Sequence, residues 1–141
     1  MILRPMTLDD ADFMLELKNY PETRKFALQT SEEIKKEDHY KWLPNNLQYF
    51  QVIEFKDSLM YKTASVGAIR IQDNEVSIWL HRDARGKGLA LIALNSVKQE
   101  GMTAKICTGN LPSLRAFIRA GFLPIDLIET PLPHYIFKYG K

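Results

Sequence analysis

The sequence feature that most constrains this chain is a glycine-rich turn between an apolar strand pattern and a helical pattern. The apolar segment 76–80 is typical of a strand, a helical pattern begins at Leu89, and Arg-Gly-Lys-Gly lies between them at 85–88. The first N–H groups of a helix have no partner within the helix, and that end carries a partial positive charge. Strand, glycine turn and helix together therefore predict an anion site, with a phosphate as the natural ligand.

The residue types within the turn suit a diphosphate. Gly86 and Gly88 let the backbone come close to a bulky ligand and adopt positive φ, while Arg85 and Lys87 add full charges. The spacing matches neither a Walker P-loop nor the dinucleotide-binding fingerprint. Taken alone, the turn is equally well explained as a tight bend in a solvated basic loop.

Two motifs resemble those of the GNAT superfamily of acyl-CoA N-acyltransferases. Residues 85–90 are similar to the family's Arg/Gln-x-x-Gly-x-Gly/Ala motif. Downstream, the family's Asn-x-x-Ser-x-x-x-Tyr-x-x-x-Gly-Phe helix is matched by Asn110, Ser113, Phe117, Gly121 and Phe122. The resemblance covers residues 2–139. It implies a single α+β domain over 1–141, with a mixed, mostly antiparallel central sheet of about six to seven strands and helices on both faces.

Composition agrees with one globular domain. The chain has 141 residues, 45% of them hydrophobic, and a net charge of +2. The basic residues are scattered, which does not favour a nucleic-acid partner. Cys107 is the single cysteine, so neither an internal disulfide nor a cysteine metal cluster is expected. No long apolar run and no signal peptide is evident, so we expect a soluble cytoplasmic protein without a bound metal or a membrane partner.

Hydrophobic periodicity and capping residues predict the order of elements. Helices are expected from Thr7 to about Asn19, at 22–26, from a Ser31 cap to about Leu43, at 89–100 and at 111–120. Strands are expected at 2–4, 49–56, 62–72, 76–80, 103–108, 122–128 and 135–139. Asp73 and Asn74 mark a hairpin turn, and residues 45–48 and 59–61 are ambiguous. Early hairpins followed by strand–helix–strand units predict a mixed sheet.

The resemblance also implies how the co-substrate acetyl-CoA would bind. Its pantetheine arm would pair with the backbone of Ile78 and Leu80, and Asn110 would contact the same arm. The pyrophosphate would lie on the turn and the first residues of the following helix: Arg85, Gly86, Lys87, Gly88, Leu89 and Ala90. The reaction implied is direct attack by a primary amine of a small molecule, sugar or peptide in a ternary complex.

Two carboxylates are candidates for the general base. Glu75 begins the fourth expected strand, where many relatives carry a glutamate, and Glu54 lies within an apolar strand. A carboxylate in apolar surroundings has a raised pKa and is a better base near neutral pH. A structural ion pair is the alternative for each. The family's tyrosine acid is replaced by Phe117, which has no proton to donate.

The acceptor side is less specified. His39, Trp42 and Leu43 share a helix face, which is typical either of core packing or of a pocket wall, and we take His39 and Trp42 as candidate substrate contacts. Residues 19–24 and 39–42 are similar to the branch that acts on nucleotide-sugar amines and protein N-termini. A CoA-binding module that is weak or inactive as an enzyme, and a plain interaction domain, remain open alternatives. Either a monomer or a homodimer is compatible with the sequence.

Overall fold

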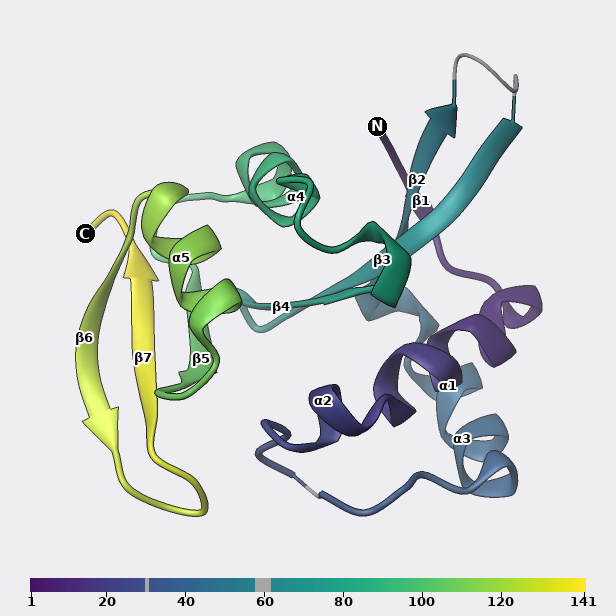
Figure 1. Ribbon diagram of the computed structural model, residues 1–141, viewed down its shortest axis with the longest axis horizontal. Helices are drawn as coiled ribbons and strands as arrows, with labels where there is room; N and C mark the ends of the chain where they lie inside the picture. The colour runs from purple at the N-terminus through teal and green to yellow at the C-terminus, as the bar shows by residue number, and fades with distance from the viewer. Residues whose placement is uncertain (30, 58–61) are drawn as a thin grey trace.

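The computed structural model describes residues 1–29, 31–57 and 62–141, and these form a seven-stranded sheet with helices on both faces (Figure 1). Along the sheet the order is β1-β2-β3-β4-β5-β7-β6. The β4–β5 pair is parallel, and every other neighbouring pair is antiparallel. The α+β fold with a mixed, mostly antiparallel sheet is thus confirmed. The strands are β1 (Ile2–Pro5), β2 (Phe50–Asp57), β3 (Lys62–Gln72), β4 (Glu75–Leu80), β5 (Thr103–Cys107), β6 (Phe122–Ile128) and β7 (His134–Tyr139).

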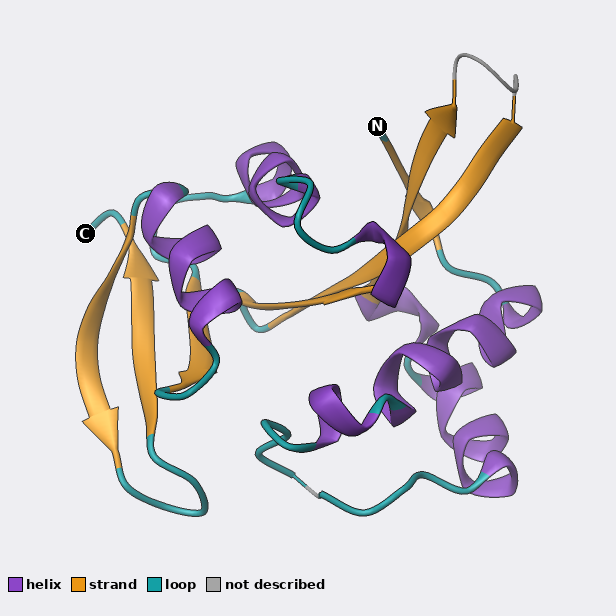
Figure 2. Cartoon of the chain, in the orientation of Figure 1, coloured by secondary structure: helices purple, strands orange, loops and turns teal. Residues whose placement is uncertain are grey.

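The helices divide into two groups on opposite sides of β4 (Figure 2). One group is α1 (Ala11–Asn19), α2 (Pro21–Arg24) and α3 (Lys36–Trp42). The other is α4 (Leu89–Val97) and α5 (Leu111–Arg119). Short 3₁₀ turns occupy Leu8–Asp10, Leu43–Asn45, Leu47–Tyr49 and Arg82–Ala84. Among the described residues, no helix has the length and apolar character needed to cross a membrane.

Each helix group covers its own hydrophobic core. Beneath α4 and α5 lies a cluster that includes Leu94, Phe117, Phe122 and Phe137. Beneath α1 and α3 lies a second cluster, drawn from Met14, Leu17, Leu43, Phe50, Val52 and Ala68. Alternating side chains of β3 divide between the two, since Ala68 belongs to the second cluster and Ile69 to the first. The sheet is therefore buried on both faces around β3 and β4.

β4 and β5 separate almost as soon as they meet. Their ladder contains the single pair Glu75↔Thr103, whereas the β3–β4 ladder continues from Gln72↔Glu75 to Gly67↔Leu80. Along the rest of these two strands, the edge of β4 that faces β5 has no strand partner. Backbone N–H and C=O groups in such a position need another partner, which water or a ligand can supply. The sheet thus contains a wedge that opens toward the C-terminal end of β4.

The third helix differs from the sequence prediction. It begins at Lys36, not at Ser31, and Lys35 is its N-cap. The reason is a tertiary hydrogen bond pair: the Asn19 side chain donates to the carbonyl of Ile34 at 3.0 Å and accepts from its N–H at 2.8 Å. A side-chain amide that pairs with a backbone N–H and C=O in this way holds the segment before α3 outside the helix.

The helix predicted at 89–100 is also shorter, because α4 ends at Val97 and Lys98 takes an extended backbone. The Lys98 ammonium donates to the carbonyl of Ala120 at 2.9 Å, at the end of α5. The hairpin turn at Asp73 and Asn74 is confirmed, since both have positive φ (52° and 60°). The ambiguous segment 45–48 falls within two 3₁₀ turns, and the segment 59–61 lies outside the described residues.

Candidate active site

The glycine turn has the geometry that an anion site requires. Gly86 and Gly88 have φ of 77° and 75°, in the left-handed region that side chains with a Cβ disfavour. Gly88 is the N-cap of α4, so the free N–H groups of the first helical turn begin here. A Cβ built on either glycine would meet no atom within 4 Å, and residues 85–88 are exposed. The turn therefore leaves open space beside a helix N-terminus.

The arginines near the turn are held by α2. Glu22 accepts hydrogen bonds from Arg82 at 2.7 and 2.9 Å and from Arg85 at 3.2 Å. The hydrogen bond from Arg82 is the main cause that lowers the pKa of Glu22 to about 2, so this carboxylate is ionised at neutral pH. Arg85 thus shares its charge with Glu22. Lys87 and the helix N-terminus supply the remaining positive charge at the turn.

Glu75 lies at the closed end of the wedge. Its side chain is 33% exposed and 4.0 Å from the Lys105 ammonium on β5. Successive side chains of a strand point to opposite faces of the sheet. The side chains of Glu75, Ser77 and Trp79 on β4 are therefore on one face. Trp79 packs against the core under α1 and α3, which identifies this face. We call it the α1–α3 face of β4.

The α1–α3 face holds an unusual lysine. The ammonium of Lys18, on α1, lies 3.7 Å from the centre of the Trp42 ring, 5.6 Å from that of Phe50 and 6.0 Å from that of Trp79. Burial, with a smaller contribution from the positive charge of Arg70, lowers the pKa of Lys18 to about 8. Sequence analysis missed Lys18, because its aromatic neighbours come from α3, β2 and β4. Trp42, a predicted substrate contact, therefore lies beside a cation on this face.

Glu54, the second candidate base, and His39, the second candidate substrate contact, each have a hydrogen-bond partner within the protein. Glu54 accepts a hydrogen bond from Arg4, and Arg4 also donates to both oxygens of Asp10, at 2.8 and 2.7 Å. The hydrogen bond from Arg4 to Asp10 is the main cause that lowers the pKa of Asp10. His39 is 1% exposed, and its Nε2 lies 2.9 Å from the carbonyl oxygen of Ala11. Both arrangements favour a structural role for Glu54 and His39.

A polar network at the end of β4 joins His81 to Glu16 and Tyr20, two residues that the sequence did not single out as catalytic. Glu16 Oε1 accepts from the Tyr20 hydroxyl at 3.1 Å and lies 3.3 Å from Nε2 of His81. Nδ1 of His81 accepts from the N–H of Asp83 at 3.1 Å, which places the proton of neutral His81 on Nε2. Glu16 and Tyr20 are four residues apart, about one helical turn, and this spacing was the signal in the sequence that could have predicted the contact. The network orients His81 between α1 and the glycine turn.

The remaining predicted residues lie on β4, at the start of α4 and around α5. Ile78 and Leu80 are half-buried on β4, and Asn110 is the half-buried N-cap of α5, just after β5. Leu89 is buried in the first turn of α4, beside Ala90. Phe117 is buried and packs edge-to-face on Phe122, with ring centres 5.1 Å apart.

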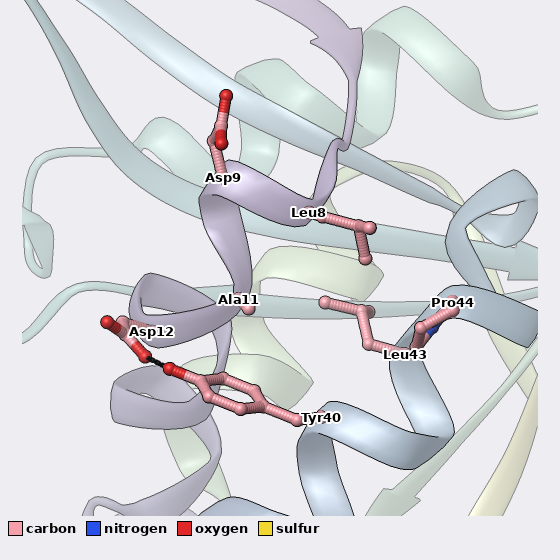
Figure 3. A pocket seen from close by; sticks show the side chains of 7 residues that line it. All are labelled: Leu8, Asp9, Ala11, Asp12, Tyr40, Leu43 and Pro44. Carbon is pink, nitrogen blue, oxygen red and sulfur yellow. Dashed lines mark hydrogen bonds between the residues drawn. The ribbon is translucent and has the colours of Figure 1, made fainter.

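A separate hollow lies between the start of α1 and α3 (Figure 3). Leu8, Ala11, Leu43 and Pro44 supply its apolar lining, and Tyr40 donates a hydrogen bond to Asp12 across it. None of its lining residues belongs to β4, β5 or the glycine turn. It is therefore distinct from the wedge.

Comparison with known proteins identifies the family. The model of the acetyltransferase (GNAT) domain matches residues 1–123, which is most of the chain. The chain therefore belongs to the GNAT family of acetyltransferases.

Solved structures with low sequence identity share the fold. A domain from Methanocaldococcus jannaschii has a TM-score of 0.80 and 20% identity, over 99% of this chain and 97% of that chain. AAC(6')-Ib in complex with paromomycin and acetyl-CoA has a TM-score of 0.76 and 15% identity, over 99% and 92%. The microcin C7 self-immunity acetyltransferase MccE, in complex with acetyl-CoA and AMP, has a TM-score of 0.73 and 15% identity, over 99% and 91%. No curated protein sequence matches the chain significantly.

The depressed pKa of Lys18 leads to a stability prediction. At pH 7 the folded protein holds an ammonium that burial disfavours, whereas the unfolded chain leaves it hydrated. Lys18→Met keeps contact with the aromatic rings and removes the charge, so it should stabilise the protein at pH 7 by about 1 kcal/mol. Between the folded pKa of about 8 and the unfolded pKa of 10.5, only the unfolded state keeps the proton, so wild-type stability rises with pH.

The measurement is urea unfolding of wild type and Lys18→Met at pH 7 and pH 9.5. The advantage of the variant should shrink at the higher pH. Lys41→Met, on the exposed side of α3, is the matched control and should change stability little at either pH. A Lys18→Met protein less stable than wild type at pH 7 would contradict this account of Lys18.

Proposed function

We propose that this protein is an acetyl-CoA-dependent N-acetyltransferase that transfers an acetyl group to a primary amine by direct attack in a ternary complex. The observation that carries the proposal is the wedge between β4 and β5, which opens toward the glycine turn at the N-terminus of α4. Two proteins of the same fold, AAC(6')-Ib and MccE, have been solved with acetyl-CoA, the first with an aminoglycoside and the second with AMP. Their acceptors differ, so the acceptor here must be argued from this chain's own residues.

The residues around the wedge suit acetyl-CoA. Gly86 and Gly88 leave space at the helix N-terminus for a diphosphate, and Lys87 adds a positive charge. The unpaired edge of β4, with the backbone of Ile78 and Leu80, would hydrogen-bond the amides of the pantetheine arm as another strand would. Asn110, at the opposite wall, would contact the same arm. An arm that starts at the turn and follows β4 points toward Glu75, at the closed end.

Acetyl-CoA, when bound, supplies an acyl group that is already activated as a thioester. The chain's own residues must then position the amine, remove its proton and shield the site from water. Glu75 is our choice of base, because it lies at the closed end of the wedge and on the face that α1 and α3 border. Its 33% exposed side chain admits a bridging water or a substrate amine. Glu54 is the alternative base, although its ion pair with Arg4 favours a structural role.

The leaving thiolate lacks the usual proton donor. Phe117 replaces the family's tyrosine and packs in the core under α4 and α5, where it offers no hydroxyl. This observation favours the second candidate function, a CoA-binding module with weak or absent transferase activity. Tyr20 has a hydroxyl at the end of β4, but that hydroxyl is bonded to Glu16. We therefore propose departure of CoA as the thiolate, with protonation by solvent.

The first experiment tests acetyl-CoA binding at the turn. Wild-type protein should show a saturable rise in melting temperature with acetyl-CoA, since a ligand that binds only the folded state stabilises it. Gly88→Asp should abolish the rise, because aspartate tolerates positive φ better than most residues but its charge repels a diphosphate. Gly101→Asp, also at positive φ (83°) but just before β5 and away from the turn, is the control and should keep the response. An unchanged response in Gly88→Asp would exclude binding at the turn.

A second experiment separates the two candidate bases. Glu75→Gln should lower the rate of acetyl transfer at saturating substrates by about 100-fold, the lower range for loss of a general base. The rate is measured by release of free CoA thiol with a panel of primary amines. Glu54→Gln should leave this rate unchanged and instead lower the melting temperature, because it weakens the ion pair with Arg4. The reverse pattern would transfer the role of base to Glu54. Binding of acetyl-CoA without transfer to any amine would favour the inactive module.

A further inference from the structure

Two cations lie on the α1–α3 face of β4 without an acidic partner. Within residues 1–29, 31–57 and 62–141, no carboxylate forms an ion pair with Lys18 or Arg70. Arg70 donates to the neutral side chain of Gln72, and Lys18 faces only aromatic rings. Desolvated charges in proteins are normally paired, and the aromatic rings attract the Lys18 ammonium without giving it a counter-ion. An anion from outside the chain would supply the missing partner.

The two cations are close to each other and to the acyl end of the wedge. Arg70 on β3 stands directly opposite Ser77 of β4 and Phe50 of β2, and Phe50 contributes a ring to the surroundings of Lys18. The charge of Arg70 is strong enough at Lys18 to contribute to the lowered pKa of this lysine. Ser77 lies two residues from Glu75 on the same strand face. Arg70 therefore borders the position where the proposed base and the amine would meet, and Lys18 lies near Arg70 on the side of Trp79.

From these contacts we propose that the acceptor is an amine that also carries a carboxylate or phosphate group, which binds to Lys18 and Arg70. This inference rests on the proposed function, because it assigns the acceptor of the same site. The rings of Trp42 and Trp79 would border the apolar or cyclic part that joins the amine to the anion. The anion would restore a counter-ion to Lys18 and so favour its charged form.

The arrangement argues against a polycationic acceptor. A second ammonium placed on this face would lie beside Lys18 and Arg70, and like charges at such range repel. Glu75 is 4.0 Å from Lys105, Glu54 on the same face of β2 is bonded to Arg4, and Glu16 of α1 lies 3.3 Å from His81. The net charge of the described groups on this part of the face is thus positive, although the chain as a whole carries only +2.

The chain contains its own reporter for this face. Its two tryptophans, Trp42 and Trp79, both lie beside Lys18. Tryptophan fluorescence therefore responds to a ligand bound here without any need for acetyl transfer. The probes are two matched pairs of primary amines: phenylalanine and phenethylamine, which differ by a carboxylate, and glucosamine 6-phosphate and glucosamine, which differ by a phosphate. Each is titrated into the full-length protein with saturating CoA and again without CoA.

The proposal predicts that at least one probe with an anionic group binds at least tenfold more tightly than its partner without that group, the range expected for a charged hydrogen bond. Lys18→Met and Arg70→Met should each remove most of that preference, and Lys18→Arg should retain part of it. Lys41→Met, which removes an exposed lysine of α3, should keep it in full. A preference for the phosphate pair alone or for the carboxylate pair alone would identify the anion.

The proposal would be overturned by equal binding of both members of each pair, by no fluorescence response to either probe with an anionic group, or by an anion preference that survives Lys18→Met and Arg70→Met. Loss of the anion preference in the control Lys41→Met would also overturn the proposal, because the preference would then depend on the overall charge of the protein and not on Lys18 and Arg70. Acetyl transfer to amines with no preference for an anionic group would refute this inference and leave the proposed function standing. Binding of the anionic probes by a protein that does not bind acetyl-CoA would refute the proposed function and leave only the anion site.

Discussion

The site depends on the separation of β4 from β5 after one ladder pair. β4 belongs to an antiparallel half of the sheet with β1–β3, and β5 belongs to a second antiparallel half with β7 and β6. The core under α4 and α5 joins the two halves, since Val76 of β4 and Ala104 of β5 pack in the same cluster. The strands are thus held together at Glu75 and Thr103 and part beyond them. Interior strand edges without partners are costly when shielded from water, and such a feature in a fold calls for a ligand.

The distribution of charge differs between the glycine turn and the α1–α3 face of β4. At the turn, Glu22 neutralises part of Arg82 and Arg85 and ties α2 to the turn. On the α1–α3 face, Lys18 keeps an ammonium among aromatic rings, where burial lowers its pKa. Proteins break the rules of local consistency mainly where function requires it. The unpaired cation at Lys18 is for this reason more informative about function than the paired arginines.

Much of the fold followed from local pattern. The strand–turn–helix at the glycine turn and the hairpin at Asp73 and Asn74 depend on residues adjacent in sequence, and both are present. The start of α3 was wrong because Asn19, fifteen positions before Ile34, holds that segment outside the helix. Lys18 was not found because its environment is assembled from α3, β2 and β4. On α1 alone, Lys18 is an ordinary helical lysine.

The central claim is that acetyl-CoA lies in the wedge with its diphosphate on the glycine turn, and hydrogen exchange measured with and without acetyl-CoA tests it most directly. The account predicts that acetyl-CoA slows exchange of the amides at Ile78, at Leu80 and in residues 86–90, because these N–H groups gain a partner. The hollow between the start of α1 and α3 should show no change. Protection at that hollow, with none along β4 or the turn, would contradict the account.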